Sequence, residues 1–152
     1  MRLCRLRFRP AFLILSAALW LFGGIAALAE PADIGARVAS RRSFQGRLLL
    51  IDVRSPKEWL RTGIPAKAVP ISMNQPLEAF LRQVRRATNG DKRRPIALIC
   101  AAGTRSSTMA EALEMDGYLD VVHVKEGMEG SGAGAGWISA GLPIRRLTKR
   151  RE

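Results

Sequence analysis

Three short and almost purely apolar runs most constrain how this chain can fold. They are Arg47 to Val53, Pro95 to Ile99 and Val121 to Val124. Each has the length and composition of a strand that is buried on both faces of a sheet. Segments with helical spacing separate these runs, and strands that alternate with helices predict a parallel sheet covered on both faces. The fold class is therefore α/β.

The segments between the runs carry recognisable helix signals. Ser55-Pro56-Lys57-Glu58 places Ser at the N-cap, Pro at the first helical position and Glu at the third, which is the pattern of a capping box. Spacing also predicts helices over 33–42, 76–87 and from Arg105 or Ser106 to Asp116, with Gly117 as a stop. A further short strand is expected over 68–72.

The N-terminus has the three-part layout of a secretory signal peptide. Four arginines (Arg2, Arg5, Arg7 and Arg9) precede an apolar run from Ala11 to Phe22, and Ala27-Leu28-Ala29 offers a cleavage site before Glu30. We therefore expect residues 1–29 to be a signal peptide and the protein to be exported, in a bacterium to the periplasm. The alternative is an uncleaved inner-membrane anchor, since residues 11–29 nearly reach across a bilayer core of about 30 Å.

Removal of the signal leaves one domain over 30–147 and a basic tail over 148–152. The loss of four arginines lowers the formal net charge from +12 to +8. Such a balance suits a small anionic substrate or an acidic partner. Nucleic acid is not expected as a partner because no binding motif accompanies the charge. A membrane is expected as a partner only if the signal is uncleaved.

Cys100 is the only thiol once Cys4 leaves with the signal. One Cys and one His cannot fill a four-ligand zinc shell, so we expect no metal site. No cofactor is expected either. Cys100 follows an apolar strand, and a short glycine-containing loop then leads into a helix. Such a loop turns backbone N–H groups inward, and with the helix N-terminus it favours a nucleophilic thiolate. The alternative is a buried structural thiol.

Four motifs in order resemble the rhodanese-like sulfurtransferases of the small single-domain type. They are Ile51-Asp52-Val53-Arg54 with Ser55-Pro56-Lys57-Glu58-Trp59; Thr62-Gly63-Ile64-Pro65; Cys100-Ala101-Ala102-Gly103-Thr104-Arg105-Ser106; and Glu126-Gly127-Met128 with Trp137-Ile138-Ser139-Ala140-Gly141-Leu142-Pro143. The resemblance implies an open parallel sheet of four to five short strands with helices on both faces. Two departures are the missing His in 62–65 and the glycine-rich stretch 129–136, which we expect to be a surface loop rather than a flexible flap.

The resemblance also implies a mechanism and a set of site residues. Cys100 would attack the sulfane sulfur of a thiosulfate-like donor, hold it as a persulfide and pass it to a thiol or cyanide. The backbone of Ala101, Ala102, Gly103, Thr104 and Arg105 would bind the substrate, with Arg105 as the cation. Supporting roles would fall to Asp52, Arg54, Glu58 and Ser106, with Glu58 as the expected partner of Arg54.

Loop length separates this chemistry from that of related folds. Cys100 to Arg105 is Cys-x4-Arg, one residue shorter than the Cys-x5-Arg loop of cysteine phosphatases and arsenate reductases. The shorter loop resembles the sulfurtransferase version. The second hypothesis is a rhodanese-fold module that binds a partner or senses persulfides with little turnover.

Overall fold

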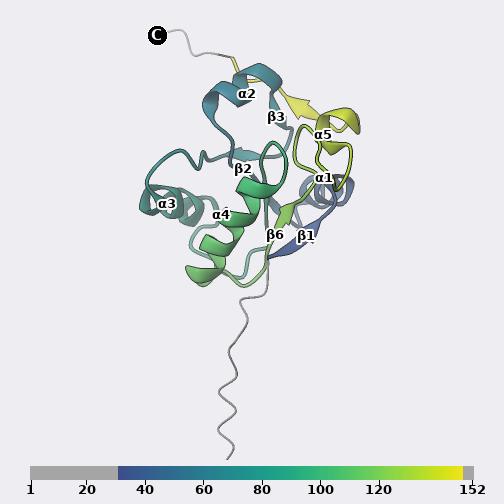
Figure 1. The fold of residues 1–152 in the computed structure, drawn as a ribbon. Coiled ribbons are helices and arrows are strands. Elements are labelled where there is room, and N and C mark those ends of the chain that lie inside the picture. The colour runs from purple at the N-terminus through teal and green to yellow at the C-terminus, as the bar shows by residue number, and fades with distance from the viewer. Residues whose placement is uncertain (1–30, 149–152) are drawn as a thin grey trace, which may run out of the picture.

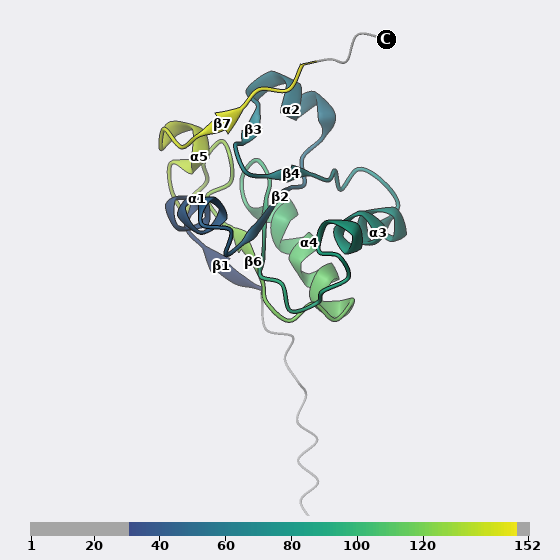
Figure 2. The same cartoon turned by 180° about the vertical axis from the view of Figure 1, so that it is seen from behind.

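A five-stranded sheet, parallel throughout, forms the centre of the molecule. The computed structural model describes residues 31–148 (Figures 1 and 2). The strand order is β1-β6-β5-β2-β4. The strands are β1 (Ala32–Ile34), β2 (Leu49–Asp52), β4 (Val69–Pro70), β5 (Ile96–Ile99) and β6 (Val121–Val124). The predicted α/β class, with a parallel sheet of short strands, is confirmed.

Helices cover both faces of this sheet, as expected. One face carries α1 (Ala36–Phe44) and α5 (Gly136–Ser139), and the other carries α3 (Leu77–Ala87) and α4 (Thr104–Met115) (Figures 1 and 2). Each face has its own buried apolar cluster. Because successive side chains of a strand point to opposite faces, Ile51 joins the cluster under α3 and α4, whereas Leu50 joins the other.

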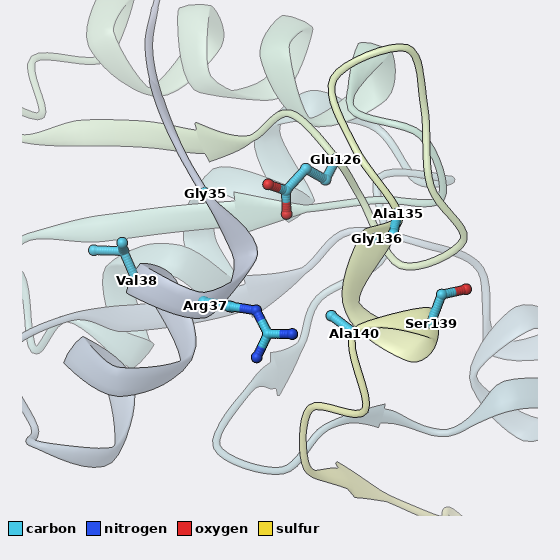
Figure 3. A pocket seen from close by; sticks show the side chains of 8 residues that line it. All are labelled: Gly35, Arg37, Val38, Glu126, Ala135, Gly136, Ser139 and Ala140. Atoms are coloured by element: carbon cyan, nitrogen blue, oxygen red, sulfur yellow. The ribbon is translucent and has the colours of Figure 1, made fainter.

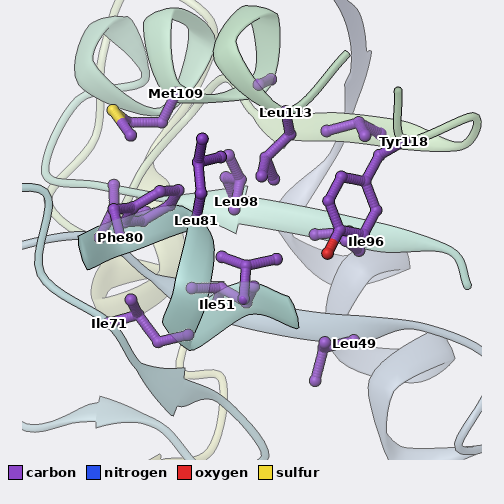
Figure 4. Close-up of a cluster of buried hydrophobic side chains, with 14 of the residues drawn as sticks. Leu49, Ile51, Ile71, Phe80, Leu81, Ile96, Leu98, Met109, Leu113 and Tyr118 are labelled. Atoms are coloured by element: carbon purple, nitrogen blue, oxygen red, sulfur yellow. The ribbon is translucent and has the colours of Figure 1, made fainter. Parts of the chain in front are cut away.

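The larger cluster lies between the sheet and the pair α3 and α4. Figure 4 shows sheet residues such as Ile51, Ile96 and Leu98 lying against Leu81 and Leu113 from the helices. The helical members repeat at three- and four-residue intervals along α3 and α4, which is why each helix presents one apolar face. Burial of this kind stabilises the fold by about 1.5–3 kcal/mol for each large side chain. The apolar core therefore fixes the position of the sheet independently of the functional residues.

Helix α2 (Pro56–Thr62) lies at the end of the molecule where the parallel strands end, beside a short antiparallel pair (Figure 1). That pair is β3 (Ile64–Pro65) with β7 (Ile144–Arg145). The predicted capping box is confirmed. The Ser55 hydroxyl accepts a hydrogen bond from the Glu58 N–H at 3.3 Å, and the Glu58 carboxylate accepts one from the Ser55 N–H at 2.9 Å.

The prediction of a helix over 33–42 was wrong at its start. Asp33 and Ile34 belong to β1, which pairs with β6, and α1 begins only at Ala36 after an extended Gly35. Three residues are too few to show a strand period, so the pairing with β6 decides their conformation. Elements β3, β7 and α5 have two to four residues and were missed for the same reason.

The glycine-rich stretch forms a tight turn. Ser131 and Gly134 exchange backbone hydrogen bonds of 3.0 and 3.1 Å. A Cβ on Gly136 would lie 2.2 Å from the backbone nitrogen of Gly130, so two stretches of backbone touch directly there. The expected loop is therefore a turn in which two stretches of backbone are in contact.

No helix within residues 31–148 is long and apolar enough to cross a bilayer. The expected signal peptide, residues 1–29, lies outside the described part of the chain, as does the tail from 149 onward. The export prediction therefore stays a prediction.

Candidate active site

Strand register brings the two predicted motif regions side by side. Asp52 at the end of β2 pairs with Ile99 at the end of β5, and the Val53 N–H donates to the Ile99 carbonyl at 2.9 Å. The loop that starts at Cys100 therefore begins next to the segment that leads into α2. This is the carboxyl end of a parallel sheet, where ligands of such folds bind.

The Cys100 side chain points to the face covered by α3 and α4. It is 1% exposed and belongs to the same buried cluster as Val53 and Met109. The Gly103 N–H donates to Cys100 Sγ at 3.2 Å. A backbone N–H aimed at sulfur stabilises negative charge there, so the geometry suits a thiolate as well as a packed thiol.

The loop turns sharply at Gly103 and enters α4 at once. Gly103 has φ +91, and a Cβ there would lie 2.3 Å from the Lys125 carbonyl oxygen, so no other residue fits. The Ser106 hydroxyl, fully buried, donates to the Gly103 carbonyl at 2.8 Å. Ser106 thereby fixes the turn, and the N-terminus of the twelve-residue helix α4 lies directly after it.

A second backbone segment holds the loop from the other side. The Met128 N–H donates to the Cys100 carbonyl at 2.8 Å, and the Glu129 N–H donates to the Ala101 carbonyl at 2.9 Å. Gly127 comes so close that a Cβ would lie 2.2 Å from the Ala101 carbonyl oxygen. The motif Glu126-Gly127-Met128 had been noted only through the resemblance, and the structure places it as the clamp of the Cys100 loop.

Arg105 is held by Glu58, which reaches across from α2. Its two terminal nitrogens donate to the carboxylate at 2.6 and 3.1 Å. The hydrogen bonds from Arg105, helped by those from Ser55 and opposed by burial, lower the pKa of Glu58 to about 2. The same hydrogen bonds raise the pKa of Arg105, with a smaller contribution from the neighbouring Cys100. Both groups are charged throughout the physiological pH range.

The expected pairing of Glu58 with Arg54 was therefore wrong. Arg54 instead donates to both carboxylate oxygens of Asp52, at 2.8 to 3.2 Å, and neither side chain is exposed. It also donates to the Thr62 hydroxyl at 2.8 Å and to the Gly63 carbonyl at 2.7 Å. The Asp52–Arg54 pair thus ties the end of β2 to the end of α2.

Ala101 is half-buried and Ala102 and Thr104 are exposed, so part of the loop reaches solvent. The substrate contacts expected for this backbone stay a prediction.

Sequence reasoning missed the Glu58–Arg105 contact. The two residues are 47 positions apart, and nothing in the local pattern links them. Trp137 of the fourth motif is fully buried, and its indole N–H donates to the Pro143 carbonyl at 3.0 Å.

A separate cavity of about 420 Å³ lies on the α1 and α5 side (Figure 3). Glu126 borders it and accepts a hydrogen bond from the Ala36 N–H at 2.9 Å, so this carboxylate caps α1. Cys100 is not among the lining residues. Within residues 31–148 no group of three His, Cys, Asp or Glu side chains is placed to hold a metal ion.

The structure is that of an α/β domain in which a buried cysteine lies in a loop between a central strand and a helix. The family model of the rhodanese-like domain matches residues 36–132 of this chain. The chain belongs to the rhodanese-like domain family.

The individual relatives have low sequence identity to this chain. An uncharacterised protein of Rickettsia conorii is 29% identical over 101 residues, which cover 62% of this chain and 80% of that protein. The crystal structure of Rv0390 from M. tuberculosis is 26% identical with a TM-score of 0.63, and the match covers 78% of this chain and all of that one. The polysulfide-sulfur transferase of Wolinella succinogenes has the same fold at 18% identity and a TM-score of 0.60, over 81% of this chain and 84% of that one.

Proposed function

We propose that this protein is a sulfurtransferase that carries sulfane sulfur as a persulfide on Cys100. The observation that carries the proposal is the thiol itself, which lies at a strand end with the Gly103 N–H donating to its sulfur at 3.2 Å. Family membership supports the same chemistry, as does the neighbouring fold of a protein described as a polysulfide-sulfur transferase.

The proposed reaction has two steps. The Cys100 thiolate attacks the outer sulfur of a donor such as thiosulfate. A new S–S bond forms, the donor S–S bond breaks, and sulfite leaves with the bonding electron pair. In the second step a thiol or cyanide attacks the outer sulfur of the persulfide and returns Cys100 as a thiolate. Backbone N–H groups of the loop stabilise the negative sulfur in each state.

The test is a donor-to-cyanide assay on the purified protein with Cys100→Ser as control. The persulfide adds about 32 Da, the nominal mass of two oxygens, so the added sulfur must also be removable by cyanide. We expect a cyanide-removable adduct and turnover that vanish together in Cys100→Ser. Turnover that survives this substitution contradicts the proposal.

One observation favours a second candidate, a partner-binding module with little turnover. Cys100 is only 1% exposed, so a donor has little direct access to the sulfur. Under this candidate, a defined partner binds wild type and Cys100→Ala equally well, and the adduct forms without sustained turnover.

We also propose export with cleavage after Ala29. The layout of residues 1–29 supports this, since basic, apolar and small-residue regions follow one another in order. N-terminal sequencing of the protein recovered from its native compartment is expected to begin at Glu30. A chain that begins at Met1 in the membrane fraction contradicts cleavage and supports anchoring.

A further inference from the structure

The single charged side chain of the Cys100 loop is already neutralised by a carboxylate. Arg105 is the only charged residue from 100 to 105, and both of its terminal nitrogens donate to Glu58. Glu58 is itself fixed, because the Ser55 N–H and hydroxyl donate to it at 2.9 and 2.7 Å. An anionic donor that approaches Arg105 therefore meets a carboxylate in the same place.

Two other cations near the loop are paired as well. Arg61, one turn after Glu58 on α2, contacts the Glu129 carboxylate at 2.6 Å. Lys125, whose carbonyl abuts Gly103, contacts Asp33 at 3.0 Å. Although the chain is strongly basic, Arg105, Arg61 and Lys125 do not form a cluster of unpaired cations at the loop.

Burial of the thiol makes donor charge important. Cys100 is 1% exposed, so a donor must lose much of its water to bring its outer sulfur to Sγ. The cost of desolvation rises steeply with charge, and a nearby carboxylate adds repulsion. A dianion pays both costs more heavily than a monoanion does.

We propose that Glu58 is a specificity-determining residue that, through its ion pair with Arg105, disfavours dianionic sulfane-sulfur donors relative to donors with one charge or none. The inference rests on the proposed sulfurtransferase function. It predicts that an organic thiosulfonate or the persulfide of a thiol is a better donor than thiosulfate. Glu58 acts on the donor in two ways. It neutralises the charge of Arg105, and its own negative charge repels an anionic donor.

Two donors isolate the effect of charge. Thiosulfate is a dianion and releases sulfite, whereas methanethiosulfonate is a monoanion and releases methanesulfinate. In both, Cys100 sulfur bonds to the outer sulfur, the donor S–S bond breaks, and the electron pair departs with the leaving group. The reacting sulfur and the reaction are the same, and a methyl group replaces one charged oxygen.

The experiment compares kcat/KM for the two donors in wild type, Glu58→Gln, Arg105→Gln and the double variant. The ratio of kcat/KM for thiosulfate to kcat/KM for methanethiosulfonate is expected to be lowest in Arg105→Gln and highest in Glu58→Gln. Wild type and the double variant are expected to share an intermediate value. One elementary charge at about 6 Å with an effective dielectric constant of ~40 changes the ratio about tenfold. The change is expected mainly in KM and to shrink as salt is added.

Glu114→Gln is the matched control. It removes the same charge from an exposed position of α4, nine residues from Arg105 and therefore about 13 Å along the helix. This control is expected to leave the donor ratio unchanged. A ratio that is the same in wild type and Glu58→Gln overturns the inference. Absence of Cys100-dependent transfer from every donor instead refutes the proposed function.

A measurement on wild type keeps the test decisive even if Glu58→Gln fails to fold. Sulfate and methanesulfonate, a dianion and a monoanion of similar shape, are compared as competitive inhibitors of the donor. Sulfate is expected to inhibit no more strongly than methanesulfonate. Sulfate inhibition that is tenfold stronger overturns the inference, because it requires an unneutralised cation at the site.

Discussion

Replacing Gly127 by alanine tests whether the backbone clamp on the Cys100 loop is as close as the structure has it. Gly127 has φ +66, and a Cβ there would lie 2.2 Å from the Ala101 carbonyl oxygen. Real side-chain carbons keep at least 3.0 Å from such an atom, so the loop must move by about 0.8 Å. Gly141 is a matched control because it has the same φ of +66 and nothing within 4 Å of the added Cβ.

The two variants share one cost and differ in another. Alanine in the left-handed region costs about 1–2 kcal/mol at either position. At Gly127 overpacking adds about 1–3 kcal/mol. The hydrogen bonds from Met128 and Glu129 to the loop carbonyls are weakened too, each worth about 0.5–1.5 kcal/mol. Gly127→Ala is therefore expected to be about 2–5 kcal/mol less stable than Gly141→Ala.

Urea unfolding followed by circular dichroism gives both free energies from the midpoints at constant slope. If the Gly127 variant folds, its displaced loop is expected to expose Cys100, and the thiol should react faster with a disulfide reagent than in the Gly141 variant. Equal unfolding midpoints and equal thiol reactivity in the two variants would refute the reasoning.

Three further predictions concern the support of the site. Asp52→Ala leaves the buried Arg54 charge without its carboxylate partner and is expected to lower the free energy of unfolding by about 3–5 kcal/mol; a loss under 1 kcal/mol in urea unfolding contradicts this. Ser55→Ala removes the cap of α2 and is expected to cost about 1 kcal/mol, measured in the same way against Ser139→Ala, a substitution at an exposed serine of α5. Because the pKa of Glu58 is lowered to about 2, its contribution is complete above the unfolded pKa of about 4.5 and is lost as the pH falls toward 2. Wild type should therefore lose about 1–2 kcal/mol more than Glu58→Gln between pH 5.5 and pH 2.5, and parallel losses would contradict the ion pair.

Local patterns in the sequence were sufficient for the parts of the fold that local physics decides. The apolar runs became β2, β5 and β6, and the Ser55 to Glu58 pattern became a capping box. The position of Cys100 at a strand end followed from the same reading. Strand β1 could not be predicted, since Ala32 to Ile34 is a strand only because β6 lies beside it.

The partner of Arg54 shows why the site itself was harder to predict. Arg54 and Glu58 are four residues apart, which places side chains together only when both are helical. Arg54 precedes α2 and continues the extended chain of β2, where residues two apart point to the same face. Its partner is therefore Asp52. Glu58, on the first turn of α2, is left to reach the Cys100 loop, a contact that depends on the tertiary arrangement of α2 and α4.

Support of the Cys100 sulfur and recruitment of an anion fall to different groups. A formal net charge of +12 suits a small anionic substrate. In the structure, the group that donates to the Cys100 sulfur is a backbone N–H, at a turn that Gly103, Gly127 and Ser106 hold in place. Arg105 is meanwhile balanced by Glu58. On the proposed function, the backbone N–H of Gly103 supports the sulfur, and the ion pair of Glu58 with Arg105 influences which donors approach it. Donor preference is then expected to change on substitution of Glu58 without rebuilding the loop that holds Cys100.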